Sequence, residues 1–323
     1  NPAPTASAWR CSCRAAGEAS PGNAALAAAA GPPTAAFSVR WRIVQSATGS
    51  TVLGIESAGC VRSDGQCRRA PASAEAASAL RQISLTGWPA LVRLPASAMT
   101  AGGSIHLGPQ VQVRNIDPVS GGRVLHAGQG VDPSGAVLEG LPGAPMSDRV
   151  QQGDAALAAQ GIDSLAEGLL GLPLAQWQAA PRVRHVDCAG VGAGAVADCA
   201  EQVQAWVRDG VQAVSVTGAL VLPPGFSLGT AQRPVILVAN GPVSLRGPGD
   251  LRGLVVAARI EADGRFGDID WEGAAVTPSD LAVIGRVQLR RSPDVMGAAA
   301  RIWVGVVPTP GSWREPLDEG TTP

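Results

Sequence analysis

The sequence contains no lysine and no tyrosine, and it has only three histidines. All 25 basic residues are therefore arginine, and 26 acidic residues bring the net charge to −1. Because basic residues do not outnumber acidic ones, we expect no basic surface stripe that would bind nucleic acid or anionic lipid. Because tyrosine is absent, no phenol can act as a catalytic acid or nucleophile.

Long apolar segments are also missing. The run AALAAAA at 24–30 is too short to span a bilayer and is stopped by Gly31 and two prolines. The opening residues NPAPTASAWRCSC contain no initiating methionine and no signal sequence. This pattern predicts processing or truncation at the N-terminus.

Motifs for metal and cofactor chemistry are scarce. His106, His126 and His185 stand in no metal-ligand spacing, although His106 and His126 could stack on neighbouring strands. The glycines of GVGAGAVADC (190–199) are followed by no Lys-Ser/Thr pair, and no G-x-S-x-G nucleophile motif occurs. We therefore expect no metal, no cofactor and no catalytic residues, so the protein is predicted not to be an enzyme.

Glycine and proline are abundant, with 41 and 26 residues, and they favour short strands and turns over long helices. In AFSVRWRIVQ (36–45) apolar and polar residues alternate, as in a half-buried strand. SATGS then turns the chain, TVLGIESAGC (51–60) returns it, and ALRQISLTGW (79–88) provides a third strand. Residues 36–88 therefore predict an antiparallel meander.

From 101 to 139, and again from 211, apolar pairs at period two are each followed within a few residues by glycine, asparagine or aspartate. Strands this short cannot bury a face alone, so they need neighbours stacked above and below, as in a solenoid. Between them, 148–181 carries leucines at helical spacing, and a second helix is expected at about 198–209.

The predicted fold class is mainly β (α+β), with an antiparallel meander near the N-terminus, then irregular parallel β-solenoid stacks and an inserted helical segment. The expected organisation is a lead-in at 1–35, the meander at 36–100, first solenoid strands at 101–147, a helical insertion at 148–210, second solenoid strands at 211–316 and a tail at 317–323.

The six cysteines fall into three local pairs, Cys11 with Cys13, Cys60 with Cys67, and Cys188 with Cys199. The C-x-x-C motif typical of zinc sites does not occur, so disulfides in an oxidising compartment are the favoured interpretation. Cys11 and Cys13 would close a tight, strained ring, so their pairing is left open.

One carboxylate pair qualifies as a catalytic candidate. GDIDWEG (267–273) places Asp268 and Asp270 on one face, with Trp271 as a platform for a sugar. Enzymes that cut polysaccharides use such pairs as acid and base. The competing interpretation is that the two acids are solvated residues at a solenoid turn, where they discourage aggregation. We favour this second interpretation.

Several segments, taken in order, resemble one known family. They are WRCSC, ESAGC followed by GQC, TAGGSIHLGPQVQVRNIDPVSGGRVLHAG, LLGLPLAQWQAAP, RPVILVANGPVSL and GSWRE at 311–315. From about Trp9 to Glu315 the chain resembles PilX-type type IV pilus assembly proteins, the minor-pilin-like family of Gram-negative bacteria. It departs from them in lacking the N-terminal anchor helix and in extending LDEGTTP beyond GSWREP.

The resemblance implies a non-enzymatic, exported structural subunit that primes or decorates pili. It implies other minor pilins, the major pilin and a tip adhesin as partners, with membrane attachment only through the missing helix. The full-length protein would be anchored in the inner membrane facing the periplasm, or lie on the extracellular pilus. In GSWRE, Trp313 is expected to plug the end of the stack and Arg314 to pair locally, with a recognition role as the alternative. The alternative functions are a secreted β-helix polysaccharide lyase or hydrolase, and a glycan-binding module.

Overall fold

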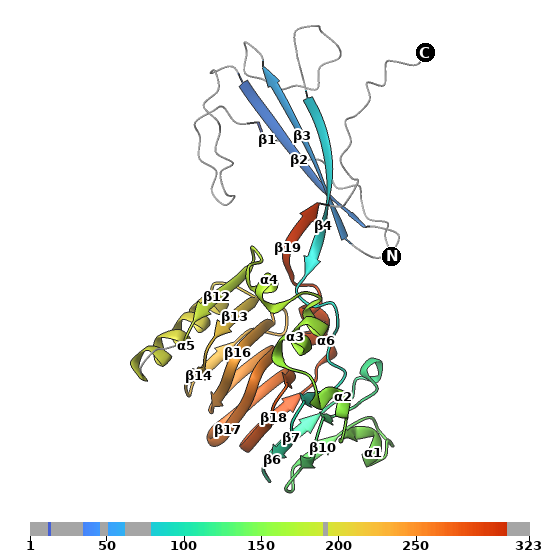
Figure 1. The fold of residues 1–323 in the computed structure, drawn as a ribbon, viewed down its shortest axis with the longest axis vertical. Helices are drawn as coiled ribbons and strands as arrows, with labels where there is room; N and C mark the ends of the chain where they lie inside the picture. The colour runs from blue at the N-terminus through green and yellow to red at the C-terminus, as the bar shows by residue number, and fades with distance from the viewer. Residues whose placement is uncertain (1–11, 14–34, 46–50, 62–78, 190–192, 309–323) are drawn as a thin grey trace. The chain divides into compact units, whose positions relative to one another are not determined.

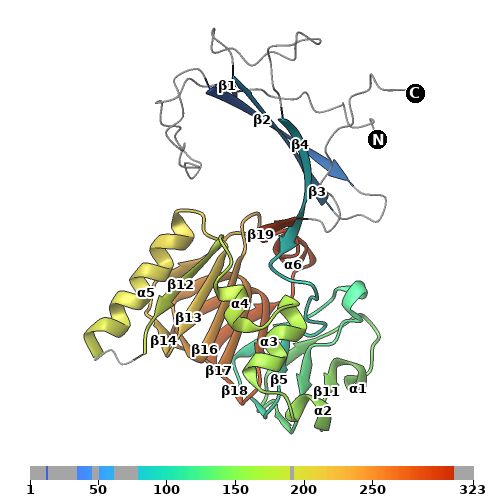
Figure 2. The same cartoon turned by 45° about the horizontal axis from the view of Figure 1, so that its top comes forward.

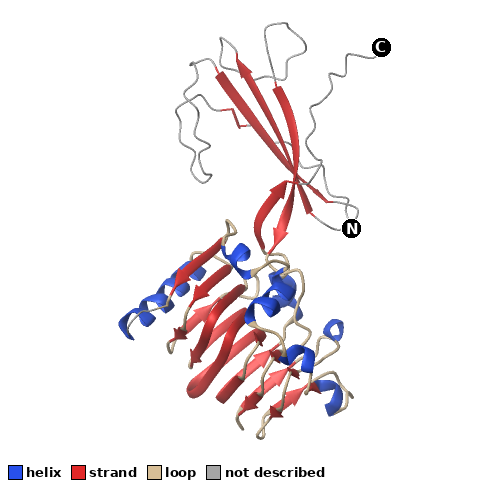
Figure 3. Ribbon diagram, in the orientation of Figure 1, coloured by secondary structure: helices blue, strands red, loops and turns tan. Residues whose placement is uncertain are grey.

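The computed structural model describes residues 12–13, 35–45, 51–61, 79–189 and 193–308 (Figure 1). The chain divides into two compact units, one formed by residues 89–305 and the other by residues 1–88 with 306–323. Strands dominate both, as Figure 3 shows, so the predicted mainly β fold class is confirmed.

The smaller unit contains the predicted antiparallel meander. Its sheet has the strand order β1, β2, β3, β4, β19. The bounds are Ser12–Cys13 for β1, Ala35–Gln45 for β2, Thr51–Val61 for β3, Ala79–Pro89 for β4 and Trp303–Pro308 for β19. Neighbouring strands from β2 to β4 are antiparallel, with Trp41 opposite Ile55 and Ile55 opposite Ile83.

The larger unit is a parallel solenoid whose strands stack in three ladders. The first ladder contains β12 (Val183–Asp187), β13 (Ala213–Thr217), the start of β16 (Val235–Arg246), two stretches of β17 (Gly249–Thr277), β5 (Met99–Ala101), β8 (Leu125–Ala127) and β11 (Val150–Gln151). The second contains β14 (Leu220–Leu222), the end of β16, the middle of β17, the start of β18 (Leu281–Arg290), β6 (Ile105–Leu107) and β9 (Val131–Asp132). The third contains β15 (Phe226–Leu228), the start of β17 and its 269–272 stretch, the end of β18, β7 (Val111–Arg114) and β10 (Val137–Glu139).

The two predicted solenoid segments form one continuous stack. Its order runs from β12 through β13, β16, β17 and β18, and then continues with β5 to β7, which come earlier in the sequence. Each of the three ladders crosses this junction in parallel register, so no edge is left open there. The chain therefore enters its solenoid in the middle of the stack.

Burial follows the period of two that the sequence shows. In the second ladder, Leu220, Val243, Ile260, Leu281 and Ile105 lie in register on consecutive strands, and all are fully buried. Because side chains alternate across a strand, the residues between them face outward. This column therefore forms a continuous core along the solenoid axis.

The first ladder differs because both of its sides are buried. Ile236, Leu254 and Val276 point away from the solenoid core yet are inaccessible to solvent. Helices α3 (Ile162–Leu170) and α6 (Pro293–Ala299) pack against β17 on this outer side (Figure 2). A strand that is buried on both faces has a nearly continuous run of apolar residues in its sequence. This explains the stretches VILVA and LVVAA, which show no polar alternation.

The remaining helices are short, except for the one at the end of the stack. They are α1 (Met146–Arg149), α2 (Ala155–Ala158), α4 (Leu174–Gln178) and α5 (Ala193–Arg208). Helix α5 packs on β14 and β15 and buries Ala200 and Val203, so it caps the solenoid beside β12. The segment 148–210, predicted as helical, thus also contains the strands β11 and β12, whose few residues give too short a pattern to separate from a helix.

Candidate functional site

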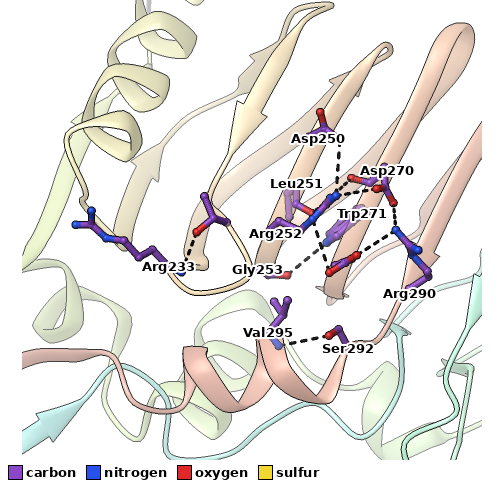
Figure 4. Close-up of polar contacts among 12 residues, drawn as sticks. Arg233, Asp250, Leu251, Arg252, Gly253, Asp270, Trp271, Arg290, Ser292 and Val295 are labelled. Atoms are coloured by element: carbon purple, nitrogen blue, oxygen red, sulfur yellow. Dashed lines mark hydrogen bonds and ion pairs between the residues drawn. The ribbon is translucent and has the colours of Figure 1, made fainter.

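The outer side of the third ladder carries a row of charged side chains of both signs. Glu272 lies in register with Arg290, Arg290 with Arg114, and Arg114 with Glu139. Arg252 extends this row at the neighbouring stretch of β17, where its guanidinium meets Asp270 and Glu272 (Figure 4). We call Arg252, Asp270, Glu272, Arg290, Arg114 and Glu139 the charged row.

Asp270 is the centre of the charged row. Its Oδ2 accepts a hydrogen bond from Arg252 Nη2 at 2.7 Å, and its Oδ1 accepts one from Arg290 Nη2 at 2.7 Å. Arg252 Nη1 also donates to the Asp270 backbone carbonyl at 2.9 Å. Hydrogen bonds between ionised groups are shorter and stronger than neutral ones. Both oxygens of this carboxylate are therefore engaged by arginine side chains.

Glu272 completes the network from the next outward position of β17. Its carboxylate lies 3.1 Å from Arg290 Nη2 and 3.7 Å from Arg252 Nε. Further along, Arg114 Nε lies 3.3 Å from Glu139. Arginines 290 and 114 are like charges in direct register, and the carboxylates on either side offset their repulsion. The ion pairs of the charged row therefore connect successive strands of the solenoid.

The predicted carboxylate pair lies on this face. Asp268 and Asp270 do share one side of β17, as predicted, while Ile269 and Trp271 point inward between them. Asp268 is 77% exposed and pairs with Arg286 Nε at 2.5 Å. Asp268 lies where the register of β17 with β18 shifts, between Gly264 and Ile269, whereas Asp270 belongs to a paired stretch of the strand and not to a turn. The alternative in which Trp271 is a platform for a sugar is wrong, because Trp271 is only 1% exposed. Its Nε1 instead donates to the Gly253 carbonyl at 3.4 Å.

The three histidines lie apart. His106 is exposed on β6 in the second ladder, opposite Asp132, whereas His126 lies on β8 in the first ladder. The alternative in which these two histidines stack is therefore wrong, because their strands belong to different faces of the solenoid. His185 is exposed on β12, at the opposite end of the stack.

His126 forms a specific contact with a helix cap. Its Nε2 lies 2.8 Å from Asp154 Oδ2, and Asp154 Oδ1 accepts hydrogen bonds from the backbone N–H groups of Ala156 and Leu157 at the start of α2. The Leu157 N–H and the His126 side chain hold the pKa of the Asp154 carboxyl below its usual value. The pair fastens α2 to the solenoid wall.

One predicted disulfide is present in the described residues. Cys188, which follows β12, is bonded to Cys199 of α5 with a Cα to Cα distance of 6.2 Å, and both residues are buried. The pairs Cys11–Cys13 and Cys60–Cys67, and the residues Trp313 and Arg314, fall outside the residues whose side chains the structure describes.

A groove of about 460 Å³ at the start of β12 and just beyond the C-terminal end of α5 was not predicted. It is lined by three segments, residues 181–184, 209–213 and 301–303, all of them in the larger unit. Arg182 and Arg184 come from the start of β12, and Arg301 comes from the turn before β19. The sequence offered one local signal, the repeated arginine of RVR at 182–184, but nothing in it indicated that Arg301 would join them.

Within the described ranges, no three side chains of the types that bind metals gather into a cluster. Among the helices described, none combines the length and the apolar character needed to cross a membrane. In the comparisons with known proteins, no family model matches the chain, and no curated protein or solved structure matches it.

Proposed function

We propose that the chain is the exported head of a PilX-type minor pilin, a structural subunit that takes part in assembling or decorating type IV pili. The family part of this proposal rests on the order and spacing of the segments that resemble PilX-type proteins. In this function the solenoid presents surfaces to other pilus proteins and carries no chemistry of its own.

The observation that carries the proposal is the position of the Cys188–Cys199 disulfide. It joins the first strand of the stack to the helix that caps it, so the covalent bond secures the end of the solenoid. Disulfides of this kind persist in oxidising compartments such as the periplasm and the cell exterior. The charged row supports the proposal as well, because its carboxylates form ion pairs with arginines of neighbouring strands, an arrangement suited to a structural part of the solenoid.

The experiment places a prepilin-type apolar helix before Asn1 and expresses the fusion in a piliated Gram-negative host. About 20 apolar residues meet the requirement of a bilayer or filament core. We expect the fusion to co-purify with sheared pili or with minor pilins, and thiol titration of the denatured, unreduced protein to find Cys188 and Cys199 blocked. The chain without the helix is the control and should not co-purify. A fusion that is exported and oxidised but never associates with pilus components would overturn the pilus assignment.

A second candidate is a secreted protein that acts on a glycan, favoured by the parallel solenoid with Asp268 and Asp270 on one outer side. In that case purified protein should release reducing ends or unsaturated products from polygalacturonate. The double variant Asp268→Asn/Asp270→Asn should abolish this release. Cleavage by the native protein that is lost in the double variant would promote this candidate over the pilus subunit.

A further inference from the structure

The groove between residues 181–184, 209–213 and 301–303 concentrates positive charge on a chain whose net charge is −1. We propose that this groove binds an acidic, extended peptide segment of a partner protein, with Arg182, Arg184 and Arg301 receiving its carboxylates. This goes beyond the proposed function, since it needs only the groove and not the pilus.

The arginines of the groove differ from those of the charged row in their partners. Arg252, Arg290 and Arg114 each form an ion pair with a neighbouring carboxylate. Arg182, Arg184 and Arg301 are exposed, and within the described part of the chain none of them forms an ion pair. A guanidinium presents its donors in a planar fork that matches a carboxylate. Three such forks in one groove favour a ligand with several carboxylates.

Two further features adjust the charge of the groove. Asp209 lines it and is the acidic residue among its lining residues. Arg233 lies beside it and donates from Nη2 to the Gly210 carbonyl at 3.3 Å, which shields a backbone oxygen near the end of α5 from an incoming anion. The groove therefore stays positive although one carboxylate lies in it, and Asp209 competes with the ligand.

The backbone next to the groove favours a peptide over a glycan. Strand β12 pairs with β13 and with no other described strand, and its edge is open beyond Val183, since the N–H groups of Arg182 and Val183 donate to the carbonyls of Val304 and Ala180. The Cys188 N–H bonds to the Thr217 carbonyl, so the register directs the backbone groups of residues 184 and 186 toward β13 and those of His185 and Asp187 away from it. A strand edge of this kind can add an extended peptide through main-chain hydrogen bonds. A glycan would make no use of that edge.

The groove also offers apolar surface between its arginines, which suits the side chains that lie between the acidic residues of such a peptide. Trp303 and Val211 line the groove and are half-buried. In an extended segment successive side chains point to opposite sides, so acidic residues at every second position can meet the arginines. The peptide class that fits is therefore one in which acidic residues alternate with small or β-branched residues.

The test measures binding to the purified full chain by fluorescence anisotropy. The probe is a labelled peptide of about ten residues that alternates glutamate and threonine, the length of an ordinary strand with flanks. A matched peptide has glutamine in place of glutamate. We expect the glutamate peptide to bind more tightly, and its affinity to fall when salt is raised from about 0.05 M to about 0.5 M, because exposed ion pairs are screened.

The variant Arg182→Gln/Arg184→Gln/Arg301→Gln should weaken binding of the glutamate peptide by about tenfold, the sum expected of three partly exposed pairs. The matched control is Arg246→Gln/Arg259→Gln/Arg286→Gln, which removes the same charge from exposed positions on the solenoid faces. It should change binding by less than about twofold. Asp209→Asn should strengthen binding.

Equal binding of the two peptides, or an equal loss in both triple variants, would overturn the proposal. Binding of an oligogalacturonate that depends on the three groove arginines, without binding of the peptide, would overturn the peptide class. None of these results depends on pilus assembly, so the groove and the pilus assignment can fail separately.

Discussion

Met99 of β5 lies opposite Ala275 of β17 in parallel register, although the two residues are far apart in the sequence. The same junction continues in the other two ladders, where Ile105 lies opposite Leu281 and Val111 opposite Val287. In a stacked solenoid each turn is stabilised mainly by its neighbours. This junction therefore determines whether the early and late parts of the solenoid unfold together.

We predict that Ile105→Ala lowers the free energy of unfolding by about 3 kcal/mol, because it leaves a cavity at the fully buried junction. Ile116→Ala is the matched control, since Ile116 is 43% exposed, and it should change that free energy by less than about 0.5 kcal/mol. The measurement is urea unfolding followed by circular dichroism. Similar midpoints for the two variants would show that the junction is not part of the cooperative unit.

A second prediction concerns the corner where β17 passes from the third ladder to the first. Gly273 has φ 143° and Gly253 has φ 148°, values that L side chains rarely adopt. A Cβ on Gly273 would overlap the Gly253 carbonyl on the neighbouring turn, and a Cβ on Gly253 would overlap the Val235 carbonyl. At this corner, glycine lets successive turns approach closely.

Gly273→Ala should therefore lower the free energy of unfolding by at least roughly 2 kcal/mol, from backbone strain and displacement of the adjacent turn. Gly130→Ala serves as the control, because a Cβ on Gly130 would meet no atom within 4 Å and its φ lies outside the range that L side chains rarely adopt. Thermal unfolding of the two variants checks this. The corner would not be as tightly stacked as described if both melted like the wild type.

Much of the solenoid could be predicted from local patterns. Ile105 and Leu107, or Val243 and Leu245, alternate with exposed or partly exposed residues, and these pairs gave the strands and their inward side chains correctly. The order of the turns could not be predicted in this way. Nothing in residues 99–114 signals that they follow residues 275–290 in the stack, because parallel register between distant segments leaves no local pattern.

The candidate sites show the same limit. The alternation of side chains along β17 correctly placed Asp268 and Asp270 on one side of the strand. The same alternation places Trp271 on the buried side, which the prediction missed. The arginines that hold Asp270 come from neighbouring turns of the solenoid, at positions 252 and 290. The groove combines segments around 182, 210 and 302. Contacts of this kind follow from the stacking and become visible only once the order of turns is known.

A third prediction separates the two acids of the charged face. Asp270→Asn should lower the free energy of unfolding by about 1 kcal/mol, because it removes the charge that joins Arg252 and Arg290 at a half-buried position. Asp268→Asn should have almost no effect, since Asp268 is 77% exposed and pairs with a single exposed arginine. Urea midpoints at low salt, and again at high salt where the difference should shrink, check this. Equal effects of the two substitutions would contradict the central position of Asp270.

The last prediction concerns acid stability and the carboxyl of Asp154. The Leu157 N–H and the His126 side chain lower the pKa of Asp154 in the folded protein. A group whose folded pKa is lowered stabilises the fold fully above its unfolded pKa, about 3.9 for aspartate, and this stabilisation is lost as the pH falls through the lower folded pKa.

Asparagine can still accept the N-cap hydrogen bonds of α2, but it does not titrate. We therefore expect Asp154→Asn to be less stable than the wild type near pH 6, and this difference to disappear as the pH falls toward 2. Urea midpoints measured along this pH range test the prediction. A constant difference between the two proteins would mean that the Asp154 carboxyl titrates alike in the folded and unfolded chain.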